Sequence, residues 1–117
     1  MQESLGERLR KRRLEKRLGL REAAAQVKIS ATYLSRIETM EERNPPAEKV
    51  IQALAALLDE PFDELMTLAG RIPEDISPYL TSDPGMPDAL RTARDAGLSS
   101  DEIRAALEQH IKARGMK

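Results

Sequence analysis

Apolar residues recur at spacings of three and four along most of the chain, a pattern typical of amphipathic α-helices. In the first predicted helix a narrow stripe of leucines runs between charged residues: Leu5, Leu9, Leu14 and Leu18. A short third helix has Leu34 and Ile37 as its inward residues. The first part of the chain is thus predicted to contain five helices, over residues 5–18, 20–27, 31–38, 47–58 and 61–69.

Residue types at the predicted helix ends support these boundaries. Gly19 and Ser30 stand where the second and third helices need N-caps. Pro45 and Pro46 end a polar loop, because the residue before a proline is disfavoured in a helix, and Gly70 can close the fifth helix. Residues 1–70 therefore form the first predicted domain.

Helix breakers dominate the next stretch, residues 71–87, which holds four prolines and Gly85. We interpret this stretch as a connector. Beyond it, residues 88–96 and 100–113 are predicted to form two more helices. Gly97 ends the first of these, and Ser99 with Glu102 has the spacing of a capping box for the second. Residues 88–117 are therefore expected to form a C-terminal helical hairpin.

Composition places the chain in the all-α class and excludes most catalytic chemistry. Alternating β-branched runs are missing, and there is no cysteine, so disulfides and thiol nucleophiles are excluded. His110 is the only histidine and no glycine-rich phosphate loop exists. We therefore expect no enzyme activity, no metal site and no cofactor, with His110 facing solvent.

No apolar stretch approaches the roughly 20 residues that span a bilayer, and the N-terminus begins with charged residues. Together with the absence of cysteine, this favours a protein of the reducing cytoplasm that makes no contact with a membrane.

Charge is divided unevenly along the chain. Residues 1–36 hold ten Lys or Arg against four Glu, a net charge of +6, whereas residues 37–117 hold nine basic and sixteen acidic residues, a net charge of −7. A cationic first third suits a phosphate backbone, although an arginine-rich helix surface is also a common aid to solubility.

Three segments carry a more specific signal: Leu18-Gly-Leu-Arg-Glu-Ala-Ala, Ile29-Ser-Ala-Thr-Tyr-Leu-Ser-Arg-Ile-Glu38 and Asn44-Pro-Pro. They resemble the lambda-repressor-like, Xre-type helix-turn-helix family over roughly residues 4–70. The resemblance implies a five-helix domain that binds duplex DNA at the prokaryotic nucleoid. It also implies a transcriptional regulator, with repression as the expected direction.

The third helix is the expected reader of bases. Since Leu34 and Ile37 anchor it to the core, the outward residues are free to enter a major groove about 12 Å wide. These residues are Ala31, Thr32, Ser35 and Arg36. Arg36 is the strongest candidate, because its planar fork can bond both O6 and N7 of guanine; the alternative is a surface ion pair with Glu41 or Glu42.

Contacts to phosphate are expected from a second set of residues: Arg21, Lys28, Tyr33, Arg43 and Asn44. Arg21 lies at a helix N-terminus, where free N–H groups already favour anions. Tyr33 could equally cover the seam between the second and third helices.

Two further expectations concern the scaffold. The resemblance implies a structural ion pair between Arg13 and Glu38. Where the family usually carries glycine after the first helix, in the turn and after the third helix, this chain has Arg17, Lys28 and Met40. Those turns are therefore either strained or remodelled.

The loop after the third helix carries Glu41 and Glu42, which would repel phosphate if they faced it. We expect both side chains to point away from the DNA-facing side.

A single module of this kind covers one half-site, and members of the family commonly bind as symmetric dimers on half-sites about 34 Å apart. We expect a homodimer on a palindromic operator. The fifth helix and the hairpin could supply the interface, or they could merely fold back onto the domain. The hairpin has apolar stripes that contain Leu90, Ala93, Ile103, Leu107 and Ile111. The alternative is an antitoxin or protease-linked adaptor that binds a protein partner through residues 71–117.

Overall fold

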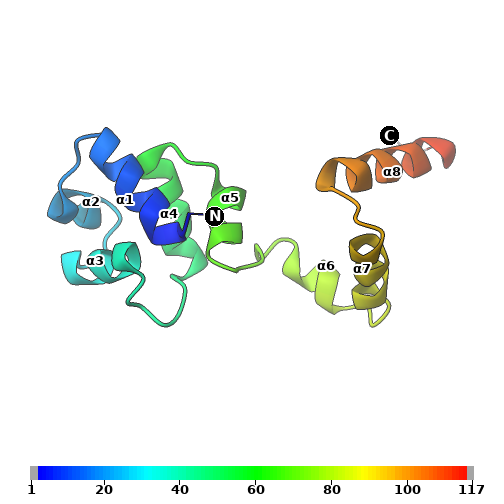
Figure 1. The fold of residues 1–117 in the computed structure, drawn as a ribbon, viewed down its shortest axis with the longest axis horizontal. Coiled ribbons are helices and arrows are strands. Elements are labelled where there is room, and N and C mark those ends of the chain that lie inside the picture. Colours follow the sequence, from blue (N-terminus) through cyan, green and yellow to red (C-terminus); the bar gives the residue numbers. More distant parts are fainter. Residues whose placement is uncertain (1–2, 116–117) are drawn as a thin grey trace. The chain divides into compact units, whose positions relative to one another are not determined.

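All regular structure within the described residues, 3–115 of this computed structural model, is α-helical, which confirms the all-α prediction. The chain divides into two compact units, Met1–Ile76 and Ser77–Lys117 (Figure 1). Unit 1 contains α1 (Leu5–Glu15), α2 (Leu20–Gln26), α3 (Ala31–Thr39), α4 (Glu48–Leu58) and α5 (Phe62–Leu68). Unit 2 contains α6 (Ser77–Thr81), α7 (Met86–Asp95) and α8 (Ser100–Ala113).

Unit 1 has one continuous hydrophobic core, to which all five of its helices contribute. Its largest fully buried side chains come from α1, α3, α4 and α5: Leu9, Leu34, Ile51, Leu54, Leu58, Leu65 and Met66. Ala23 and Ala24 of α2 are also buried, and their small size lets α2 pack closely against α3. The core thus fixes α3 against both α1 and α2 at the edge of the unit (Figure 1).

Two details of the predicted core are wrong. Leu14 is 50% exposed, and Arg13 is buried in its place. The reason is geometric, since a row of every fourth residue from Leu5 and Leu9 continues to residue 13 and not to residue 14. In α4 the spacing of apolar residues predicts that Leu57 is buried, but Leu58 is buried and Leu57 is only partly buried.

Helix starts follow the expected capping chemistry. The Ser30 hydroxyl accepts the Tyr33 N–H at 3.0 Å and begins α3, as predicted. The Ser99–Glu102 capping box of α8 also forms as predicted. A second capping box, between Ser4 and Glu7 at the start of α1, was not anticipated.

The turns that lack the family's glycines keep the left-handed backbone. Arg17, Lys28 and Met40 have φ values of 57°, 61° and 62°. Of the two predicted alternatives, strained turns and remodelled turns, the structure therefore shows strained turns. Each side chain occupies a conformation that costs roughly 1 to 2 kcal/mol relative to glycine.

A close approach between α1 and α3 requires glycine at residue 6. A Cβ atom there would lie 2.3 Å from the carbonyl oxygen of Glu38 and 2.5 Å from that of Ile37. Gly6 therefore lets the start of α1 touch the backbone at the end of α3.

Among residues 77–115 of unit 2, no side chain is fully buried. Leu90 on α7 and Leu107 on α8 are 49% and 57% exposed, whereas Ala93 and Ile103 are half-buried. His110 on α8 is exposed, as expected. Between residues 3 and 115, no helix combines the length and apolar character needed to cross a membrane.

Candidate nucleic-acid interface

The pose of α3 is set from its inward side. Leu34 and Ile37 are 1% and 2% exposed, and Ala24 of α2 lies in the same core cluster. The Met40 sulfur accepts the Gly6 N–H at 3.4 Å, which adds a polar contact between the end of α3 and the start of α1. With this side held, the opposite side of α3 is presented outward.

A buried ion pair fixes the last turn of α3 to α1. Arg13 donates from Nε to one oxygen of Glu38 at 2.7 Å and from Nη2 to the other at 2.9 Å. Nη1 donates to the Leu18 carbonyl at 2.9 Å. The hydrogen bonds to Glu38 raise the pKa of Arg13 despite its burial. The pair is thus bidentate, and both groups are satisfied in a nearly dry site.

The four predicted base-reading residues do lie together. They line one open hollow on the surface of unit 1, together with residues from α2 and from the loop after α3. The full lining is Leu20, Arg21, Ala31, Thr32, Ser35, Arg36 and Glu41. We refer to this surface as the α3 hollow. It brings two guanidinium groups, those of Arg21 and Arg36, to a face on which α3 contributes three small side chains, Ala31, Thr32 and Ser35.

Arg36 is the longest side chain on this face of α3 and is 56% exposed. Its Nη1 lies 4.0 Å from a Glu42 carboxylate oxygen, so the surface pairing considered as the alternative is present as a loose contact. An exposed contact of this length stabilises little and leaves the guanidinium free to rotate.

The predicted phosphate-binding residues occupy several places. Arg21 lines the α3 hollow, and Lys28 is exposed in the left-handed turn between α2 and α3. Tyr33 is half-buried against the core, which favours the interpretation that its ring covers the seam between α2 and α3. Arg43 and Asn44 are exposed on the α3–α4 loop.

Arg71, which the sequence pattern did not indicate as important, holds the α3–α4 loop in place. Its Nε donates to the Pro46 carbonyl at 2.6 Å and its Nη2 to the Pro45 carbonyl at 3.2 Å. Glu74 is tied to the same unit, because its N–H donates to the Glu48 carboxylate at 2.9 Å. The loop that carries Arg43 is therefore held from the far end of α5.

Much of the positive charge of α1 is used within the fold. Arg8 contacts Glu60 and Glu64 at 3.1 and 3.2 Å, and Lys16 pairs with Asp59. The hydrogen bond from Arg8 lowers the pKa of Glu64, and the hydrogen bond from Lys16 lowers the pKa of Asp59.

Arg12 completes this stripe by donating to the Leu58 carbonyl at the end of α4, at 2.8 Å. The excess charge of residues 1–36 therefore overstates what is available to bind DNA, since three of the cations stabilise the junction between α4 and α5.

Glu41 is the residue whose placement differs most from expectation. The prediction that it points away from the face presented by Arg36 is wrong, because Glu41 lines the α3 hollow. Glu42 lines a different cavity, of about 150 Å³, together with Leu5 and Ile37. The sequence shows two adjacent acids but gives no signal for which of them lines the α3 hollow.

Comparison with known proteins gives one family and two similar structures. Residues 4–68 match the helix-turn-helix domain family. The chain is similar to a crystal structure of the master regulator for biofilm formation SinR in complex with DNA, at 31% identity over 53% of this chain and 97% of that chain, with a TM-score of 0.49. It is also similar to a SinR protein/SinI protein complex, at 26% identity over 96% of this chain and 99% of that chain, with a TM-score of 0.47. No curated relative matches it.

Proposed function

Because this chain belongs to the helix-turn-helix domain family, as its lambda-repressor-like motifs predict, we propose that it regulates transcription by placing α3 in the major groove of a specific duplex sequence. The observation that carries the proposal is the α3 hollow. Thr32, Ser35 and Arg36 gather there on a helix whose opposite side is fixed by buried residues. Such preorganisation lets side chains meet base edges without first ordering the backbone.

The four outward residues have different roles in this proposal. Arg36 reads guanine through O6 and N7, a contact worth about 1 to 3 kcal/mol of discrimination. Thr32 and Ser35 contact base edges through their hydroxyl groups, and the Thr32 methyl can also contact thymine. Ala31 offers only apolar contact, and its small size lets the helix approach the groove floor.

Contacts to the phosphate backbone position the helix but carry no sequence information. We assign them to Arg21, Lys28, Arg43 and Asn44, which are all exposed. Tyr33 contributes through its hydroxyl group only, since its ring packs against the core.

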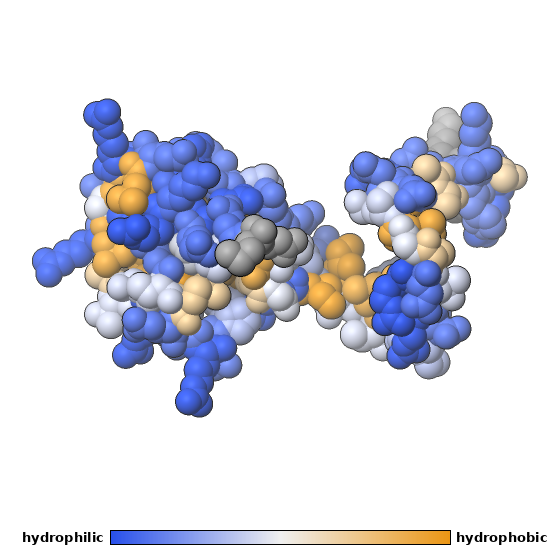
Figure 2. Space-filling view, in the orientation of Figure 1, coloured by the Kyte–Doolittle hydropathy of each residue, from blue (hydrophilic) through white to orange (hydrophobic). Residues whose placement is uncertain are grey.

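We further propose that the protein acts as a homodimer on a palindromic operator, and that it represses transcription by occupying that operator. The exposed apolar side chains of unit 2 support self-association, since Leu90 and Leu107 are 49% and 57% exposed on amphipathic helices. Figure 2 shows apolar side chains at the surface of this unit. A second copy would present the same surface and bury both.

The alternative function is that of an antitoxin or protease-linked adaptor, which would use the same exposed surface of unit 2 for a different protein. A monomer in solution that gains a stable partner through unit 2 supports this alternative. A dimer lost on Leu107→Glu, but kept on Gln109→Glu on the same helix, supports self-association.

Selection of bound duplexes from random DNA tests the main proposal. The wild-type protein should select a palindrome, and Arg36→Ala should relax the preference for one guanine in each half. Arg10→Ala, which removes an exposed arginine of α1 outside the α3 hollow, is the matched control and should select the wild-type sequence. A protein that retains no duplex even in dilute buffer, while remaining folded, contradicts the proposal.

A further inference from the structure

Glu41 occupies a place that a DNA-binding surface does not ordinarily give to an anion. Its side chain is exposed and lines the α3 hollow beside Thr32 and Arg36. A carboxylate there would lose its water as α3 enters the groove. An unpaired ion in such a place is costly, so in the bound state it must meet a hydrogen-bond donor.

The backbone holds Glu41 in a fixed position relative to Arg36. Met40 adopts the left-handed conformation that ends α3, and the Glu41 N–H donates to the Arg36 carbonyl at 2.9 Å. The Met40 N–H donates to the Ile37 carbonyl at 3.2 Å, which completes a Schellman motif. Glu41 is therefore part of the rigid end of α3 and not of a free loop.

The neighbouring acid does not line the α3 hollow. Glu42 is half-buried, lines the cavity next to Leu5 and lies 4.0 Å from Arg36 Nη1. Of the two acids, Glu42 can balance the charge of Arg36 from the protein side, and Glu41 is the one presented outward with it.

Two donor-bearing targets exist in a major groove, the N4 amino group of cytosine and the N6 amino group of adenine. Adenine carries the N7 acceptor beside its amino group, and that lone pair repels a carboxylate. Cytosine offers its donor without an acceptor on the same base. A phosphate offers no donor and repels the carboxylate.

We propose that Glu41 is a base-reading residue that accepts a hydrogen bond from the N4 amino group of a cytosine, adjacent to the guanine read by Arg36. This inference rests on the proposed DNA binding of α3. It assigns sequence specificity to a residue outside α3. Arg36 would then select a base that presents hydrogen-bond acceptors, and Glu41 would select a base that presents a hydrogen-bond donor.

The test is selection from random duplexes with four proteins: wild type, Glu41→Ala, Glu41→Gln and Glu42→Gln. The wild-type sequence should contain a preferred cytosine next to the Arg36-dependent guanine. Glu41→Ala should lose that preference, and Glu41→Gln should move it toward adenine, because an amide can bond N6 and N7 together. Glu42→Gln removes the same charge one residue away and should keep the cytosine.

Competition binding gives the magnitude. Replacing the cytosine by thymine, which presents an acceptor in place of the amino donor, should weaken wild-type binding roughly tenfold and Glu41→Ala binding less than about twofold. Thermal unfolding of all four proteins checks that their folds are equally stable.

The outcomes separate the two claims. If the wild type binds no duplex, the proposed function and this inference both fail. If it selects a palindrome that Glu41→Ala leaves unchanged, Glu41 does not read a base, while the role of α3 stands. A uniform gain in affinity for all sequences in Glu41→Ala, with no change of preference, identifies simple phosphate repulsion and also overturns the inference.

Discussion

Gly6 and the main chain of Glu38 are in direct contact, so that a methyl group at residue 6 would lie 2.3 Å from the Glu38 carbonyl oxygen. Because the opposing atoms belong to the backbone at the end of α3, they cannot swing aside as a flexible side chain would. We expect Gly6→Ala to destabilise the protein by about 2 to 3 kcal/mol through overpacking. Urea unfolding followed by circular dichroism measures this, with Gly19→Ala as the control, since a Cβ at Gly19 meets nothing within 4 Å.

The Arg13–Glu38 pair should behave as a unit. Glu38→Leu leaves the guanidinium buried without its anion and should cost on the order of 3 to 5 kcal/mol. The double change Arg13→Met with Glu38→Leu should cost clearly less than the sum of the two single changes, because no charge is then left unpaired. A double-mutant cycle measures the coupling, and additive losses would show that the two groups do not depend on each other.

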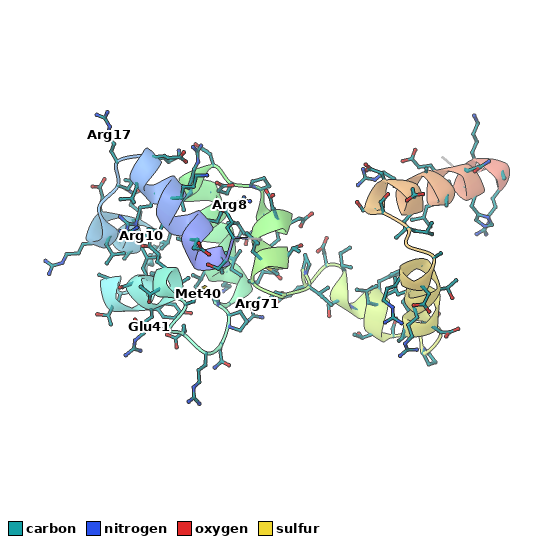
Figure 3. All side chains as sticks on the ribbon, viewed as in Figure 1. Arg8, Arg10, Arg17, Met40, Glu41 and Arg71 are labelled. Atoms are coloured by element: carbon teal, nitrogen blue, oxygen red, sulfur yellow. The ribbon has the colours of Figure 1, made fainter. Side chains whose placement is uncertain are left out.

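Relief of backbone strain should stabilise unit 1. Arg17 extends away from the body of the unit (Figure 3) and has a φ of 57°. Glycine at this position should raise the free energy of unfolding by about 1 kcal/mol. The reverse change at a glycine of the same backbone type, Gly70→Ala with φ of 69°, should lower it by a similar amount, since a Cβ there has open space and only the backbone conformation changes. Equal stability of all three proteins would argue against strain.

Acid should weaken the junction between α1 and the α4–α5 turn. Arg8 and Lys16 lower the pKa values of Glu64 and Asp59 below their ordinary values of 4.5 and 3.8. A depressed acid pKa adds stability that is complete above the unfolded-state pKa and is lost as the pH falls through the folded-state pKa. Stability should therefore decline below about pH 4.5 more steeply in the wild type than in Arg8→Gln or Lys16→Gln. Arg10→Gln is the control and should follow the wild-type curve.

The dependence of DNA affinity on salt should report individual phosphate contacts. If Arg21 binds one phosphate, Arg21→Gln should reduce the slope of log affinity against log salt by about 0.9. Arg12→Gln should leave the slope unchanged, because that guanidinium is bonded to the Leu58 carbonyl, although it should lower stability. A smaller slope in Arg12→Gln would mean that α1 also faces the DNA.

Periodicity and capping residues predicted the five helices of unit 1 well, because those signals act within one turn of helix. Ser30 begins α3 through a contact three residues away, and the sequence shows such contacts directly. The seating of α3 was likewise visible in Leu34 and Ile37.

What the sequence did not reveal depends on contacts between distant segments. Gly6 is required by a backbone 32 positions later, and Arg71 binds carbonyls 25 and 26 positions earlier. The direction of the Glu41 side chain depends on the left-handed backbone of Met40. Because the family usually has glycine at that position, the sequence did not predict the geometry of this loop. The net charge of residues 1–36 did not indicate how many cations of α1 are free, because the acidic partners of these cations lie at the end of α4 and the start of α5.

The left-handed backbone of Arg17, Lys28 and Met40 has a consequence for how long the protein survives in a cell. If each costs about 1 kcal/mol, the unfolded population is on the order of a hundredfold larger than glycine at all three would allow. Proteases act on that population, so the steady-state amount of this protein should respond steeply to small rises in temperature.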